Sequence, residues 1–357
     1  MSTSPLSFFV VGILALMFLM PSNGARDAPQ IAAPGAPLTG DYERAMAAFR
    51  AADYATAAVL FASAESASPG ATNALLWQAK ALVHLGAFLK AEGVLRGYLA
   101  FHPSSDDALY LLGFTLHRLD KPRESLTMYT TAAAIKPPTG DDLKIVGLDY
   151  VLLNDYSDAV KWLQKAVDLD SKNGDAWYYL GRAYYSEGRV PDARRAFLTV
   201  LSLNAQDARA ENNLGLVFES EGKTNDALEA YRKAIAWQQA SARLSEQPFA
   251  NLGNLLIEQQ RAAEAISPLE RAVTLAPKSG FCHLKLGTAY LRLGRWRDAH
   301  RELETAVQLE PDNPSPHYQL GRLYQETHEI DRAKAEFART QELQSHAAGK
   351  VAPPPKQ

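Results

Sequence analysis

The sequence predicts an all-α solenoid built from about nine helical hairpins. Three observations lead to this fold class. Apolar residues recur at spacings of three and four, the whole pattern repeats every 34 residues, and glycine or proline follows many of the expected helices. A repeat array grows one unit at a time and needs no single closed core, so one array can account for most of a 357-residue chain.

The clearest hairpin lies in residues 175–197, with the sequence DAWYYLGRAYYSEGRVPDARRAF. Trp177 and Tyr184 fall on one face of a first helix, because side chains three and four residues apart return to the same side. Gly188 is expected to end this helix in the left-handed conformation that glycine adopts without steric cost. Phe197 lies on the apolar stripe of a second helix and is expected to pack back against the first.

The other units follow at the same period. With Gly174 as position 1, they begin at Leu38, Thr72, Asp106, Gly140, Gly174, Ala208, Glu246, Gly280 and Pro314. Four extra residues, around 241–245, separate the sixth unit from the seventh. Four residues are about one helical turn, so this insertion is expected to lengthen either the preceding helix or the loop after it.

The pattern W-x-x-L-G-x-x-Y, then glycine, then A-x-x-x-F, resembles the tetratricopeptide repeat. The resemblance implies a right-handed superhelical solenoid whose first helices line a concave groove, where members of the family hold extended peptides. The first two units depart from the pattern, since Arg44 and Ala45, and Gln78 and Ala79, replace the Leu-Gly pair. Terminal repeats are commonly atypical because one of their faces lacks a neighbour.

The array is expected over residues 38–347, with different segments on either side. Residues 1–25 contain a 13-residue apolar run, Phe8–Met20, followed by proline and small residues, which predicts a cleaved signal peptide. An uncleaved N-terminal anchor is the alternative. Residues 26–37 are expected to form a flexible leader, and residues 348–357 a disordered, proline-containing tail.

The composition argues against several functional classes. A net charge of −3 gives no reason to expect nucleic acid. The only cysteine, Cys282, is expected to be a buried, inert thiol. His283 and His317 occupy equivalent places in adjacent units, about a helix-packing distance apart, which is too far for one zinc ion. Acidic pairs such as Asp141 and Asp142 are expected to cap helices. We therefore expect no metal, no cofactor and no catalytic site.

Unit positions 6 and 9 point away from the core stripe of each first helix, and the family resemblance places them in the groove. An asparagine there can donate to a peptide carbonyl and accept from a peptide N–H, and a cation can pair with a carboxylate. Units two to five offer mainly apolar groups, which are either an exposed binding patch or partly buried against neighbouring helices. A merely solvated inner face remains an alternative for the polar half. The candidate groove residues are Trp77, Phe114, Tyr179, Arg182, Asn213, Asn251, Asn254, Lys285 and Arg322.

These patterns predict a non-catalytic, exported scaffold, periplasmic or secreted, that binds a protein or an extended peptide in its groove. No small-molecule substrate is expected, and membrane contact only if the N-terminal segment stays uncleaved. The alternative function is a self-associating structural or assembly component of cell-envelope secretion or polysaccharide machinery. Its basis is the last hairpin, whose second helix runs directly into the tail without a further helix to cover it.

Overall fold

The computed structural model describes residues 40–70, 73–239 and 244–351, with side chains up to residue 346. In this part of the chain the structure has 18 α-helices and no strand. The expected signal peptide (1–25), the expected leader (26–37) and the last six residues of the expected tail (352–357) lie outside the described residues.

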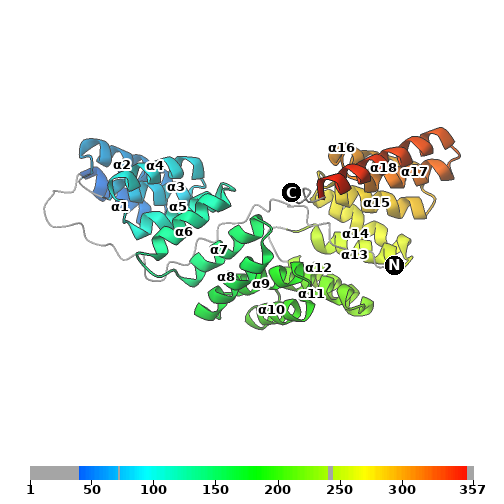
Figure 1. The fold of residues 1–357 in the computed structure, drawn as a ribbon, viewed down its shortest axis with the longest axis horizontal. Helices are drawn as coiled ribbons and strands as arrows, with labels where there is room; N and C mark the ends of the chain where they lie inside the picture. Colours follow the sequence, from blue (N-terminus) through cyan, green and yellow to red (C-terminus); the bar gives the residue numbers. More distant parts are fainter. Residues whose placement is uncertain (1–39, 71–72, 240–243, 352–357) are drawn as a thin grey trace, which may run out of the picture. The chain divides into compact units, whose positions relative to one another are not determined.

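The helices alternate between the first and second members of nine hairpins, and Figure 1 shows consecutive helices lying side by side, as in α3 with α4 and α15 with α16. The first helices are α1 (Gly40–Arg50), α3 (Ala74–His84), α5 (Asp106–Arg118), α7 (Gly140–Leu152), α9 (Gly174–Ser186), α11 (Ala208–Ser220), α13 (Gln247–Glu258), α15 (Gly280–Arg292) and α17 (Pro314–Glu326). The second helices are α2 (Tyr54–Ala67), α4 (Phe88–Phe101), α6 (Pro122–Ala133), α8 (Tyr156–Leu169), α10 (Val190–Leu203), α12 (Thr224–Gln238), α14 (Ala262–Leu275), α16 (Trp296–Leu309) and α18 (Ile330–Val351).

The repeat period predicts the helix starts well. Six of the nine first helices begin at the predicted residue, and α1, α3 and α13 begin one or two residues later. The four-residue insertion adds little to the preceding helix, because α12 has 15 residues against 14 in α10 and α14. α12 ends at Gln238 and α13 begins at Gln247, and residues 240–243 of the insertion region lie outside the described residues. Gly188 has a φ of 74°, as expected for the residue that ends a helix in the left-handed conformation.

The last helix is longer than expected. α18 has 22 residues and ends at Val351, four residues past the predicted end of the array at 347. The three consecutive prolines begin only at residue 353, so nothing in the sequence up to 351 prevents helix formation. None of the helices described has both the length and the apolar character of a membrane span.

The described structure divides into two compact units between Ala183 and Tyr184, inside α9. Each unit has its own core of residues from the facing sides of its hairpins. Phe61, Leu95 and Leu163 are fully buried in the N-terminal unit, and Tyr231 and Leu303 in the C-terminal unit. These are the large apolar residues that the repeat places on second helices, so the predicted stripe does face the core.

The small residue at position 8 of the first helix allows close helix packing. A Cβ atom on Gly287 would lie 2.7 Å from Cγ of Leu303, and one on Gly321 would lie 2.7 Å from the ring of Phe337. One acidic helix start acts as a cap, as expected, whereas α5 is capped by Ser105, the residue before its acidic pair. At the start of α7, Asp142 accepts a hydrogen bond of 2.7 Å from the backbone N–H of Thr139, in a capping box.

Candidate functional site

Four first helices of the C-terminal unit carry polar side chains at position 6. We call this set the polar row: Asn213 on α11, Asn251 on α13, Lys285 on α15 and Gln319 on α17. The 34-residue period places them on the same face of successive hairpins, because each hairpin repeats the geometry of the one before it. Three of the four are half-buried and Asn213 is buried.

The two asparagines of the polar row are held by the protein through their amide nitrogens. Asn213 donates from Nδ2 to the carbonyl of Arg209 at 2.8 Å, and Asn251 donates from Nδ2 to Oδ1 of Asn212 at 3.0 Å. Within the described residues, Oδ1 of Asn251 accepts no hydrogen bond. A side-chain amide has two N–H groups and one oxygen, so Asn251 keeps one donor and its acceptor for a ligand.

Lys285 and Gln319 have polar atoms that the described residues leave unsatisfied. The Lys285 ammonium lies 5.1 Å from the centre of the Phe281 ring, and it makes no hydrogen bond or ion pair with any described residue. Burial lowers the pKa of Lys285, although the nearby Glu258 charge acts in the opposite direction. Oε1 of Gln319 is buried and has no hydrogen-bond partner in the described part of the chain. Because buried polar atoms are normally paired, Gln319 is where a ligand or a water molecule would be expected, and Lys285 adds a cation that has no ion-pair partner within the described residues.

An acidic pair close to Lys285 is not apparent from the sequence. Glu219 on α11 accepts a hydrogen bond from the hydroxyl of Tyr231. Burial raises the pKa of Glu219 to about 7, with the bond from Tyr231 opposing this shift and the Glu258 charge adding to it. Glu258 in turn accepts a 2.9 Å hydrogen bond from Nδ2 of Asn254. Asn254, a predicted groove residue, is therefore paired with a carboxylate of its own helix.

Two arginines lie near the C-terminal end of this face. Arg322 on α17 and Arg292 at the end of α15 line an open cleft of about 530 Å³, together with Arg261 and Glu264 at the start of α14. Arg292 donates to the backbone carbonyl of Ile257, and Arg322 makes no hydrogen bond or ion pair with a described residue. Arg182, the remaining predicted cation, belongs to the N-terminal unit, where its guanidinium lies 5.9 Å from the centre of the Tyr178 ring.

The predicted apolar residues are packed into the N-terminal unit. Phe114 is only 8% exposed, and its ring meets Phe88 at 6.4 Å between centroids. Trp77 is half-buried and contacts Phe49 of the preceding hairpin edge to face at 5.1 Å. Tyr179 is half-buried and packs against the core of this unit. Of the two interpretations left open by the sequence, these contacts favour partial burial against neighbouring helices.

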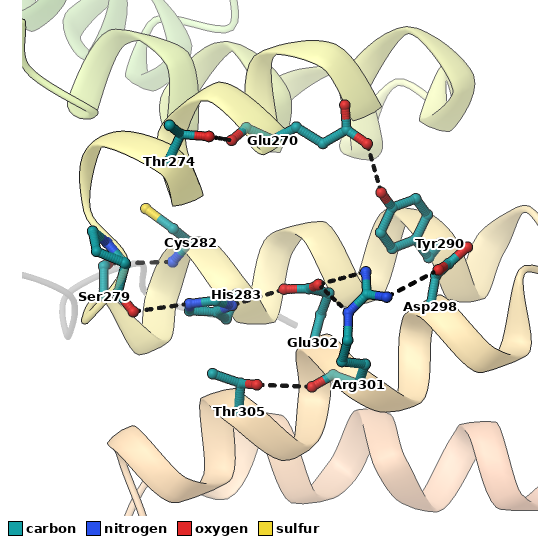
Figure 2. Close-up of polar contacts among 11 residues, drawn as sticks. Glu270, Thr274, Ser279, Cys282, His283, Tyr290, Asp298, Arg301, Glu302 and Thr305 are labelled. Carbon is teal, nitrogen blue, oxygen red and sulfur yellow. Dashed lines mark hydrogen bonds and ion pairs between the residues drawn. The ribbon is translucent and has the colours of Figure 1, made fainter.

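The histidines at position 4 are structural. Nδ1 of His283 on α15 lies 2.7 Å from Oε2 of Glu302 on α16 (Figure 2). Nε2 of the same ring lies 3.1 Å from the carbonyl oxygen of Pro277. A carboxylate and a carbonyl both accept hydrogen bonds, so this geometry favours the doubly protonated ring. The hydrogen bond to Glu302 raises the pKa of His283, which agrees with this assignment. His317 makes the corresponding 2.7 Å contact with Glu336. Among the described residues there is no group of three potential metal ligands.

Trp177 occupies the same position 4 as His283 and uses the equivalent partner. Its indole N–H donates to the carbonyl of Ser171 at 3.0 Å, and Ser171 and Pro277 both occupy position 32 of the preceding unit. Tryptophan and histidine are therefore alternative N–H donors that join a first helix to the end of the hairpin before it.

Comparisons with known proteins agree with this geometry. Family models described as tetratricopeptide repeat match residues 42–108, 150–213, 186–242, 247–279 and 290–348. No curated protein sequence matches the chain.

Solved structures share the fold at low sequence identity. The crystal structure of the APC/C hetero-tetramer Cut9-Hcn1 has a chain that is 20% identical with a TM-score of 0.57. The match covers 83% of this chain and 56% of that chain. A tetratricopeptide repeat protein from Parabacteroides merdae is 15% identical over 70% of this chain and 97% of its own, with a TM-score of 0.55. PilW, a type IV pilus biogenesis factor, is 18% identical with a TM-score of 0.52. The match covers 57% of this chain and 92% of the PilW chain.

The present chain thus spans little more than half the length of the Cut9-Hcn1 chain that it matches. At these identities the likenesses concern the fold alone. Repeats are recognised in both units, and the hairpins follow one another at the predicted period. The protein is a repeat scaffold that belongs to the tetratricopeptide repeat family.

Proposed function

We propose that this protein is a non-catalytic scaffold that binds an extended segment of a protein partner along the polar row of its C-terminal unit. The observation that supports this proposal best is the unused hydrogen-bonding capacity of three consecutive hairpins. Oδ1 of Asn251, the ammonium of Lys285 and Oε1 of Gln319 have no partner within the described residues. Oε1 of Gln319 is buried without a partner in the described part of the chain, which is unusual for an amide oxygen and supports a ligand or a water molecule at this place.

An extended peptide supplies the groups that these residues lack. Its backbone N–H groups can donate to Asn251 and Gln319, and a carboxylate on its side chain can pair with Lys285. Pairing would also offset the burial that lowers the pKa of Lys285. The row is built on helices, so little ordering of the scaffold is needed on binding, and less of the interaction energy is lost.

The binding test uses peptides selected from a random display library on the purified protein. We expect the dissociation constant of selected peptides to rise about 30-fold or more in the Asn251→Ala/Lys285→Ala double variant, because hydrogen bonds to charged groups are strong when desolvated. The matched control is Asn225→Ala/Lys334→Ala, which removes the same residue types from exposed positions in the same unit. Equal affinity for the double variant and the unchanged protein would refute this binding surface.

Export is part of the proposal and has its own test. The apolar run at residues 8–20 supports a cleaved signal peptide, and an anchor remains the alternative. Intact-mass measurement of the protein recovered from its host would distinguish them, since cleavage near residue 25 removes the whole apolar run. A full-length mass in the membrane fraction would favour the anchor.

Self-association is a second candidate function, favoured by the end of the array. Tyr318 at position 5 of the last hairpin is 47% exposed, whereas the equivalent Tyr178 and Leu284 are 7% and 5% exposed under neighbouring residues. Ile330 on the same hairpin is 49% exposed. If copies stack through this end, Tyr318→Glu/Ile330→Glu should convert an assembly into a monomer in analytical ultracentrifugation. A monomer for the unchanged protein at about 100 μM would refute stacking, since useful assembly needs micromolar affinity or better.

A further inference from the structure

A second cleft of the C-terminal unit lies away from the polar row. It measures about 380 Å³ and is formed by α12, α13 and α14. Its apolar lining comprises Ile235, Phe249, Leu252 and Leu256. Phe249, Leu252 and Leu256 lie on α13, and at 100° per residue they point 100° to 160° away from Asn251. The cleft and the polar row therefore use different sides of this helix.

Two arginines stand at the edge of this apolar cleft. Arg232 on α12 and Arg271 on α14 both line it and are exposed. Neither makes a hydrogen bond or ion pair with any residue that the structure describes. Glu264, the one acidic residue in the lining, is already engaged by Arg261 through hydrogen bonds of 2.7 and 2.6 Å. The cleft therefore combines an apolar floor with two exposed arginines. The charge of Arg232 also acts on Glu264, whereas Arg271 has no ion-pair partner within the described residues.

A proline gives the same cleft a backbone acceptor. Pro268 lies inside α14 and has no N–H, so the carbonyl of Glu264, four residues earlier, lacks its usual helical donor. Both residues line the cleft, as does Ser267, whose hydroxyl makes no hydrogen bond within the described residues. A ligand that brings an N–H group can pair with this carbonyl.

The next hairpin has a polar bridge at the place equivalent to this cleft. Positions 4 and 23 of that unit are His283 and Glu302, whose hydrogen bond joins α15 to α16 (Figure 2). In the hairpin of the cleft the same positions are Phe249 and Pro268, which cannot form a polar bridge. The two helices thus leave an apolar, unbridged gap at this place.

We propose that this cleft binds the C-terminal residue of a protein partner that ends in an apolar amino acid. Such a residue carries an apolar side chain for the floor, a carboxylate for Arg232 and Arg271, and an N–H for the carbonyl of Glu264. A guanidinium fits a carboxylate in two-point geometry, which sets the direction of the chain end. A fatty acid would match the floor and the charges but would leave the carbonyl without a donor.

The probe for this site is N-acetyl-L-leucine, which has these three groups and, besides them, only the acetyl group that makes its nitrogen an amide. Binding is followed by NMR in protein labelled at the methyl groups of leucine and isoleucine, with Ile235, Leu252 and Leu256 as reporters. We expect saturable shifts of these methyls with a dissociation constant of about 1 mM, as suits a ligand of this size. N-acetyl-L-leucinamide lacks the carboxylate, N-acetylglycine the side chain and 4-methylpentanoate the N–H, and each should bind about 10-fold more weakly.

Variants test the two charges separately. Arg232→Gln and Arg271→Gln should each weaken the binding of N-acetyl-L-leucine about 10-fold. The control Arg297→Gln, which changes an exposed arginine on α16, should leave the binding unchanged. The Asn251→Ala/Lys285→Ala variant should bind the probe normally, so this site can succeed or fail independently of the polar row. Equal binding of N-acetyl-L-leucine and N-acetyl-L-leucinamide would overturn the proposal, as would the absence of saturable methyl shifts up to about 20 mM.

Discussion

Replacing Gly287 by alanine tests the close packing between the two helices of a hairpin. Gly287 on α15 faces Leu303 on α16, and an added Cβ would lie 2.7 Å from Cγ, 2.9 Å from Cδ2 and 3.2 Å from the backbone nitrogen of Leu303. Leu303 is fully buried, so its side chain has no open space to enter. The two helices must therefore move apart or the leucine must leave its preferred rotamer.

The free-energy change can be estimated from two opposing effects. Overpacking of a close-packed core typically costs about 1–3 kcal/mol, and the backbone contact places Gly287→Ala in the upper part of that range. Alanine in a helix gains about 1 kcal/mol over glycine, so the net loss should be about 1–2 kcal/mol. Gly93 on α4 provides the control, because it is exposed and a Cβ there meets nothing within 4 Å. Gly93→Ala should stabilise its hairpin by about 0.5–1 kcal/mol.

Hydrogen exchange measured by mass spectrometry is the suitable assay, because repeat arrays open hairpin by hairpin and a single melting temperature averages over them. We expect the slowest amides of α15 and α16 to exchange about 10-fold faster in Gly287→Ala, and those of α4 to exchange more slowly in Gly93→Ala. Unchanged or slower exchange in α15 and α16 would show that the hairpin tolerates a methyl group, and the packing explanation would be wrong.

Three further predictions concern pH, thiol chemistry and the N-terminal unit. The pKa of His283 is raised by Glu302, so the stabilisation of α15 against α16 is fully present below its ordinary value of about 6.5 and is lost as the pH rises through the raised value. After correction for the intrinsic pH dependence of amide exchange, the protection of these helices should therefore fall as the pH rises through the raised pKa of His283. A His283→Phe variant that lost protection in the same way would contradict the assignment. Burial raises the pKa of the Cys282 thiol to about 11 and leaves it 1% exposed, so thiol reagents should modify it only in denaturant; rapid labelling of the native protein would refute this. Trp77→Ala should destabilise the first two hairpins by about 2–3 kcal/mol, measured by hydrogen exchange, because its ring packs against Phe49 and Phe61. The same variant should bind peptides selected on the polar row with unchanged affinity. Unchanged exchange together with weaker peptide binding would refute this prediction.

The sequence predicts the fold well because the fold is local. Each hairpin follows from spacings within 34 residues, and the small and large residues that meet across a hairpin, such as Gly287 and Leu303, lie 16 positions apart in every unit. The site is less predictable. Position 6 identifies the polar row, yet the partner of Asn251 is Asn212, 39 residues away, and the burial of Phe114 depends on its neighbours. These contacts depend on rotamers and on the approach of successive hairpins, which no spacing rule specifies.

The link between α12 and α13 has a consequence for engineering the chain. Nε2 of Gln238 donates to the carbonyl of Ser245 at 3.1 Å, and the backbone N–H of Ser245 donates to Oε1 of Gln238 at 2.9 Å. The side-chain amide thus acts as a surrogate peptide group, and it ties the end of one hairpin to the point where the chain enters the next. With both ends held, doubling the length of chain between them should cost only about 0.6 kcal/mol. A reporter domain or an affinity tag inserted after Gln239 should leave the hairpins on both sides in register, which makes this link the natural entry point for labelling the protein in its middle.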